Sequence, residues 1–232
     1  MDTLEIFGVA GLPEIGPGDD LAGLIVDACA LRQRDVVVVT QKIVSKAEDR
    51  LEAIDPSDPL GHKPLVERES VRVLRRRGEL IISETEHGFV CANAGIDLSN
   101  VEKGYAALLP VDSDRSARRI RDGIRGRAGV EVAVIVSDTF GRPWRRGVTD
   151  VAIGCAGIRP ILDLRGAPDA LGREMQVTEV AVVDELAAAA ELVMGKASGL
   201  PVGVIRGVDP GWFGPGSVAE DLVRAPADDL FR

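Results

Sequence analysis

Two uninterrupted apolar runs constrain this fold more than any other feature of the sequence. "DVVVVT" spans Asp35–Thr40 and "VEVAVIVSD" spans Val130–Asp138. Strands with one solvated face alternate apolar and polar residues, whereas strands covered on both faces read as continuous valine and isoleucine. We therefore expect both runs to be buried strands at the centre of a sheet.

Helical patterns fall between these runs and weaker strand signals. Further strands are expected at Leu4–Gly11, Glu79–Thr85 and Pro201–Gly207. Helices are expected at Leu21–Ala28 behind the capping aspartates Asp19 and Asp20, at Pro64–Arg77, at an Asp114-capped segment with Ala117, Ile120 and Ile124, and at Val182–Ala197. Residues 45–63 and the tail after Gly207 are rich in Pro, Asp and Gly and indicate loops. The mixture predicts an α+β (mixed α/β) fold.

Composition excludes several classes of function. The 232 residues are 45% apolar and 28% charged, which is typical of a soluble globular protein. A formal net charge of −9 argues against a nucleic-acid partner. Three cysteines without a C-x-x-C spacing argue against zinc and a disulfide framework, and favour a reducing, cytoplasmic setting. No apolar run approaches the ~20 residues of a membrane span, so no membrane partner is expected.

Polar residues stand at the ends of three expected strands. Thr40, Gln41 and Lys42 follow the first, Ser137, Asp138 and Thr139 end the second, and Arg206 ends a third. Open α/β sheets bind ligands beyond the carboxyl ends of their strands. Any one of these residues is more often a solvated strand end, but together they indicate a ligand site.

Asp97 and Asp138 are the candidate ligands for a divalent metal. Mg²⁺ and Mn²⁺ prefer oxygen ligands and often combine one or two carboxylates with substrate phosphates. Asp97 also begins the turn-like "DLSN" that ends at Asn100, and a turn-forming role alone is enough to explain an aspartate there. Spacing by itself leaves both interpretations open.

Several basic residues are candidates for binding phosphate. Lys46 follows the first buried run and can meet a phosphate as a point charge, or be a solvated lysine. Arg142, Arg145 and Arg146 can bind phosphate or carboxylate, or pair with surface acids. The run Arg75–Arg77 is interpreted as a solvated helix end. "AELVMGKA" lacks the first glycine and the final Ser/Thr of a Walker A loop, and no catalytic residue is assigned.

Six motifs in a fixed order add a family resemblance. They are "GLPEI", "VTQKIVSKAE", "HGFVCANAGIDLSNV", "LLPVDSDRSARRI", "SDTFGRPWRRGVTDVAIGCAGI" and "DELAAAAELVMGKASGLPVGVIRG". Over nearly its whole length the chain resembles the coenzyme F-420 γ-glutamyl ligase family, and also the N-terminal half of longer actinobacterial members. We expect one such ligase domain across residues 1–232 and no C-terminal nitroreductase-like domain.

The resemblance implies a GTP-dependent amide ligase. It would add L-glutamate to the lactyl carboxylate of a deazaflavin precursor and then further γ-linked glutamates, through an acyl phosphate, releasing GDP and phosphate. The implied cofactors are Mg²⁺ or Mn²⁺, one or two per site, and K⁺; the implied assembly is an intertwined homodimer with an unusual coenzyme F-420 γ-glutamyl ligase-like fold. The alternatives are a nucleotide-binding subunit without turnover and a metal-dependent phosphohydrolase.

The resemblance also implies site residues. Metal positions fall on Asp97, Asp138 and Thr139. GTP contacts fall on Leu12, Pro13, Glu14, Ile15, Gln41, Lys46, Asn100, Met194, Gly195, Lys196, Ala197, Ser198, Gly199, Leu200 and Pro201. Gln41, Val148 and Lys196 depart from residues common in the family. With a lysine at position 196, the occupancy of a second metal position is undecided. Lys196 is also a candidate contact for phosphate.

Overall fold

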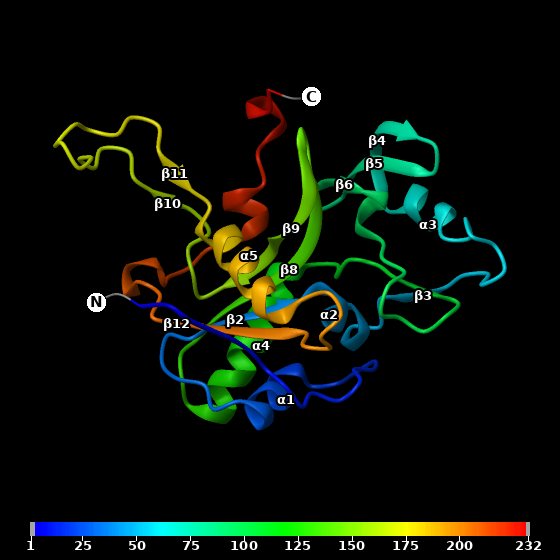
Figure 1. Ribbon diagram of the computed structural model, residues 1–232, viewed down its shortest axis with the longest axis horizontal. Coiled ribbons are helices and arrows are strands. Elements are labelled where there is room, and N and C mark those ends of the chain that lie inside the picture. The colour runs from blue at the N-terminus through cyan, green and yellow to red at the C-terminus, as the bar shows by residue number, and fades with distance from the viewer. Residues whose placement is uncertain (1–2, 231–232) are drawn as a thin grey trace.

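A five-stranded sheet organises the computed structural model, which describes residues 3–230. Its strand order is β1-β12-β2-β8-β9 (Figure 1). The strands are β1 (Glu5–Gly8), β2 (Val36–Thr40), β8 (Ala133–Arg142), β9 (Arg145–Ala156) and β12 (Val202–Arg206). Only β2 and β8 pair in parallel; the other neighbours in this sheet are antiparallel. With helices and three smaller sheets, the fold is α+β, as predicted.

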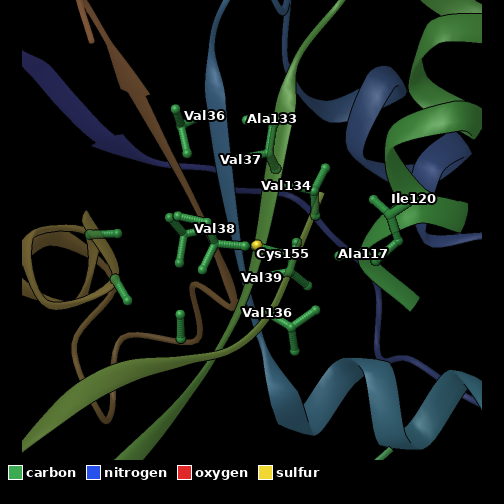
Figure 2. Packing of buried hydrophobic residues seen from close by; sticks show 14 of the residues in the cluster. Val36, Val37, Val38, Val39, Ala117, Ile120, Ala133, Val134, Val136 and Cys155 are labelled. Carbon is green, nitrogen blue, oxygen red and sulfur yellow. The ribbon is translucent and has the colours of Figure 1, made fainter. Parts of the chain in front are cut away.

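Helices cover both faces of the central strands. α5 (Val182–Met194) packs on β1, β12 and β9, and α4 (Ser113–Ala128) packs on β8 and β9, with α1 (Leu21–Ala28) beside α4 (Figure 1). Figure 2 shows Ala117 and Ile120 of α4 on the side of Val134 and Val136. Val36–Val39 are fully buried. Burial on both faces explains why these runs lack polar alternation.

A smaller unit with its own core lies to one side of the main sheet (Figure 1). It contains α3 (Lys63–Arg68), the sheet β4 (Ser70–Arg77), β5 (Leu80–Thr85) and β6 (Val90–Ala92), and the pair β3 (Leu51–Ala53) with β7 (Tyr105–Ala107). Its buried residues are Val66, Ile81, Ala94, Ile96, Ala106 and Leu108. α2 (Gln41–Ala47) follows β2 directly, and β10 (Leu162–Asp163) pairs with β11 (Glu179–Val180) in a separate arm.

The structure corrects the predicted helix at Pro64–Arg77. The helix ends at Arg68, and Ser70–Arg77 is strand β4, joined to β5 through a turn at Gly78. Gly78 has φ +57°, which glycine adopts at little steric cost. The turn makes a hairpin, so Arg75–Arg77 lie on an edge strand and not at a helix end.

Smaller differences concern caps and loops. Asp20 caps α1 as predicted, accepting the N–H of Gly23, but α4 is capped by Asp112 and not by Asp114. The predicted loop at 45–63 contains the end of α2, strand β3 and the start of α3, and the tail contains short helical turns. β1 and α5 are shorter than expected, ending at Gly8 and Met194. Within residues 3–230 no helix has the length and apolar character to cross a bilayer.

Gly154 is where α4 meets β9 most closely, and it gives a stability prediction. A Cβ atom there would lie 2.3 Å from the Ser113 carbonyl carbon, which only a backbone shift can relieve. Gly154→Ala should lower the free energy of unfolding by about 1–3 kcal/mol, the usual cost of overpacking. Urea denaturation measures this. Gly126→Ala on α4 is the control, because the added Cβ meets no atom within 4 Å there. This variant should be neutral or stabilising.

Candidate functional site

A cavity of about 730 Å³ lies at the carboxyl ends of β2 and β8. Thr40 and Ser137 are register partners in this parallel pair, so both strands deliver their following residues to the same edge. Segment 12–15 and the loop after α5 complete the wall. The cavity is therefore located where the ends of the two buried runs predicted a ligand site.

Nearly all the predicted nucleotide and metal residues line this cavity. The exceptions are Ala197 and Ser198. Residues from distant parts of the sequence, such as Glu14, Asn100 and Thr139, thus share one wall. Their roles in binding remain predictions, but the structure brings them together.

Asp138 is the most perturbed carboxyl in the cavity. Burial raises its pKa to about 7, and the negative charges of Asp97 and Asp150 push in the same direction. A hydrogen bond from the Thr139 N–H (2.8 Å) and the charge of Lys42 oppose the rise. A carboxyl so placed is poorly compensated when ionised, which is a typical state for a group that awaits a cation.

Asp97 comes from the smaller unit and is held by Lys42 and Ser99. The Lys42 ammonium donates to Asp97 Oδ2 at 2.6 Å and to the Ser99 carbonyl and hydroxyl oxygens. The Ser99 N–H donates to Asp97 Oδ1 at 2.7 Å. Burial opposes ionisation of Asp97, but these hydrogen bonds hold its pKa below the usual value. Asp97 is therefore a preformed anion at the cavity wall.

Asp150 was missed in the sequence analysis. It lies on β9 opposite Thr139, is 3% exposed, and accepts hydrogen bonds from Ser137 Oγ (3.1 Å) and Thr139 Oγ1 (2.6 Å). Lys196 Nζ lies 2.8 Å from its Oδ1. The available signal was the hairpin itself, since β8 and β9 flank a short turn and place Asp150 beside the candidate metal residues.

Gln41 and Lys46 show how α2 presents its polar side chains. Gln41 is buried, and its amide nitrogen donates to Ser45 Oγ (2.6 Å) and to the Leu108 carbonyl (2.9 Å), which fixes the helix against the chain following β7. Lys46 is 8% exposed and forms an ion pair with Glu14 across the cavity wall. Lys46 is thus a nearly buried cation and not a freely solvated lysine.

The residues present fit a metal ion shared with a ligand better than one held by protein alone. Among residues 3–230, no three His, Cys, Asp or Glu side chains are grouped to hold a metal. Asp97 and Asp138 are nevertheless close enough for their charges to interact. Mg²⁺ is commonly bound by one or two carboxylates plus substrate phosphates, and not by an all-protein cage.

Two predicted basic contributions lie elsewhere. Arg206 is at the other end of the sheet, because β12 runs antiparallel to β2, and it pairs with Asp35 at 3.0 Å. Arg142, Arg145 and Arg146 lie on the far end of the β8–β9 hairpin and do not line the cavity. Arg142 Nη2 instead donates to the Arg146 carbonyl.

Comparison with known proteins identifies the family. The model of the F420-0:gamma-glutamyl ligase family matches residues 11–207. The chain belongs to the F420-0:gamma-glutamyl ligase family. The coenzyme F420:L-glutamate ligases of Methanothermobacter thermautotrophicus and Methanopyrus kandleri are 45% and 42% identical to it, covering at least 99% of each chain. The protein of the same name from Haloarcula marismortui is 41% identical over 99% of this chain and 96% of its own.

The extent of the match agrees with the geometry of the site. The segment that matches the family model begins one residue before Leu12, the first residue of the cavity wall, and ends just after β12. Every residue that lines the cavity lies within it. The family match therefore includes the whole lining of the cavity.

Proposed function

We propose that this chain is a coenzyme F420:L-glutamate ligase that uses GTP and a divalent cation to activate the carboxylate of a deazaflavin precursor. The observation that carries the proposal is the convergence of carboxyl groups (Asp97, Asp138, Asp150) and nearly buried lysines (Lys42, Lys46) on one cavity at the ends of β2 and β8. The full-length relatives named coenzyme F420:L-glutamate ligase support it.

The chemistry requires activation because a carboxylate is a poor acyl donor. A precursor carboxylate oxygen attacks the γ-phosphorus of GTP, the bond to the β-phosphate oxygen breaks, and GDP leaves. The glutamate amine then attacks the acyl carbon; phosphate leaves, the amine loses a proton, and an amide remains. Phosphoryl transfer of this kind depends mostly on positioning and charge neutralisation.

The chain's own residues match those two tasks. Lys46 lines the cavity and would meet the GTP phosphates, and Lys42 holds Asp97 through a hydrogen bond. Asp97 and Asp138 would hold Mg²⁺ or Mn²⁺, which as a Lewis acid neutralises charge on the phosphates. Asn100 lies in an exposed segment and has φ +52°, a left-handed backbone conformation that asparagine tolerates better than most residues.

The direct test is product analysis. Purified chain is incubated with precursor, L-glutamate, GTP, Mn²⁺ and K⁺, and the deazaflavin product is weighed by mass spectrometry. One glutamyl unit added per GDP formed supports the ligase. GTP hydrolysis that needs neither precursor nor glutamate would instead identify a phosphohydrolase, and GTP binding without any turnover a nucleotide-binding subunit.

Lys46 gives the first prediction on nucleotide affinity. Lys46→Ala should weaken GTP binding by about 1–3 kcal/mol, the range for losing a hydrogen bond to a charged group. Precursor binding measured without nucleotide should not change. Calorimetric titration of both ligands measures this, with the exposed Lys103→Ala as the matched control. Equal losses for both ligands would indicate damage to the fold and contradict the assignment.

We also propose a homodimer, because two projecting segments carry exposed apolar side chains. The β8–β9 hairpin and the β10–β11 arm project from the rest of the molecule (Figure 1). Trp144 and Val148 on the hairpin are 85% and 59% exposed, and Leu171 and Val177 in the arm are 81% and 84% exposed. Apolar groups gathered on projecting arms are typical of protein–protein contacts. Sedimentation equilibrium should give twice the 24.6 kDa chain mass. A single 24.6 kDa species at micromolar concentration would contradict the dimer.

A further inference from the structure

Lys196 lies among oxygen atoms of the kind that bind metal ions. Its ammonium contacts Thr139 Oγ1, lies 2.8 Å from Asp150 Oδ1, and lies 3.7 Å from Glu191 Oε1. Asp150 is 3% exposed, so its charge needs a nearby cation. Lys196 supplies that cation from the loop that follows α5.

Both acceptor atoms of Asp150 already have donors, and Oδ1 has two. Oδ1 accepts from Thr139 Oγ1 and Lys196 Nζ, and Oδ2 accepts from Ser137 Oγ. A divalent ion at Oδ1 would have to displace the ammonium, and an ion at either oxygen would meet the repulsion of its positive charge. Thr139 is drawn into the same group, since its hydroxyl lies between Asp150 and Lys196.

The rest of the cavity has a different charge balance. Asp97 pairs with Lys42 at 2.6 Å, whereas Asp138 has no lysine or arginine within ion-pair distance among residues 3–230. Asp97 and Asp150 thus each have an ammonium partner, and Asp138 between them has none in the described part of the chain. An added cation is favoured beside Asp138 and Asp97, and not beside Asp150.

We infer that Lys196 acts as a built-in cation at Asp150 and Thr139, so that the cavity takes one divalent ion per chain, at Asp97 and Asp138. The inference rests on the proposed metal-dependent function. A lysine ammonium is a compact point charge that presents three donors, so it can serve hydroxyl and carboxylate oxygens together. Lys196 is then a positioning residue, which holds Asp150 and Thr139 whatever the supply of metal.

The test counts bound Mn²⁺ on the full chain in K⁺-free buffer. Free Mn²⁺ is measured by electron paramagnetic resonance, with and without a non-hydrolysable GTP analogue, and Mn²⁺ bound to the analogue alone is subtracted. We expect one Mn²⁺ per chain for the wild type and two for Lys196→Gln. The exposed Lys103→Gln, which makes the same change outside the cavity, should bind one.

A double variant locates the second ion. Lys196→Gln with Asp150→Asn should return to one Mn²⁺ per chain, because the carboxylate that attracts the second ion is gone. Two ions on the wild type, or one ion on Lys196→Gln, would overturn the inference. No ion on the wild type would contradict the proposed metal site itself and the inference with it. If circular dichroism shows that Lys196→Gln is unfolded, the wild-type count alone decides between one ion and two.

Discussion

Replacing Asp138 by asparagine is expected to abolish ligation and, at neutral pH, to stabilise the metal-free protein. Asparagine keeps an oxygen that can accept the Thr139 N–H but cannot supply the charge that a divalent cation needs. Metal affinity and activity fall about 10–100-fold when groups that merely support metal ligands are changed, so a ligand itself should cost at least about 100-fold. Mass spectrometry of the product under saturating GTP and Mn²⁺ measures the loss.

The stability part of this prediction depends on pH. Asp138 has a pKa raised by burial from 3.8 to about 7 in the folded chain. The folded state therefore disfavours the ionised carboxyl of Asp138. This lowers the free energy of unfolding progressively as pH rises from about 4, and the loss is complete above about 7. Asp138→Asn should gain little near pH 4 and roughly 2–4 kcal/mol above pH 7.5, by the usual conversion of a pKa shift.

Urea denaturation at both pH values, without metal, gives the comparison. Asp27→Asn, an exposed change on α1, is the control and should shift neither stability nor activity. Mn²⁺ with a GTP analogue should raise the melting temperature of the wild type but much less that of Asp138→Asn. Full activity in Asp138→Asn would eliminate Asp138 as a metal ligand.

Replacing Asp114 by alanine should cause the largest loss of stability among these changes. This buried carboxylate accepts the N–H groups of Cys155 (2.7 Å), Val218 (2.9 Å) and Ala219 (3.1 Å) and the hydroxyl of Ser217 (2.8 Å). It thus ties the C-terminal tail to α4 and β9. Alanine leaves these donors without their acceptor, at an expected cost of about 3–5 kcal/mol.

Denaturant unfolding checks the size of this effect, and Asp122→Ala on the exposed side of α4 provides the control. Exposed ion pairs such as those of Asp122 contribute little, so that variant should change stability by less than about 1 kcal/mol. Asp114→Asn should lie between the two, since its amide oxygen can still accept some of the donors. A cost for Asp114→Ala no greater than that of Asp122→Ala would show that the tail is not held through this carboxylate.

The sequence predicted the central sheet best because its signal is local. Val36–Val39 and Val132–Val136 are buried on both faces, and such strands can be predicted from a continuous run of apolar residues alone. The parallel pairing of these two strands then placed Thr40 and Ser137 together at one edge. The pairing of strands that are distant in the sequence cannot be predicted from such a local pattern. Arg206 ends an apolar run just as Ser137 does, but β12 is antiparallel, so its end lies on the far side of the sheet.

The remaining differences have related causes. The segment Ser70–Arg77 mixes valines with arginines that suit either a helix or a strand, and its hairpin partner β5 decides the outcome. Asp150 acquires its role only when β9 folds back beside β8. The closeness of Asp97 to Asp138 came from the family resemblance; spacing in the sequence offers no reason for it.

Asp97 and Asp138 belong to two separately packed units, which gives the proposed metal ion a mechanical role. Asp97 follows Ile96 of the smaller core, and Asp138 follows Ser137 and the run Val132–Val136 of the large core. An ion that binds both carboxylates would act as a removable cross-link. Its binding free energy would stabilise the one alignment of the two units in which both carboxylates can reach it. Removal of the metal by a chelator would then weaken the contact between the two units while leaving each hydrophobic core packed.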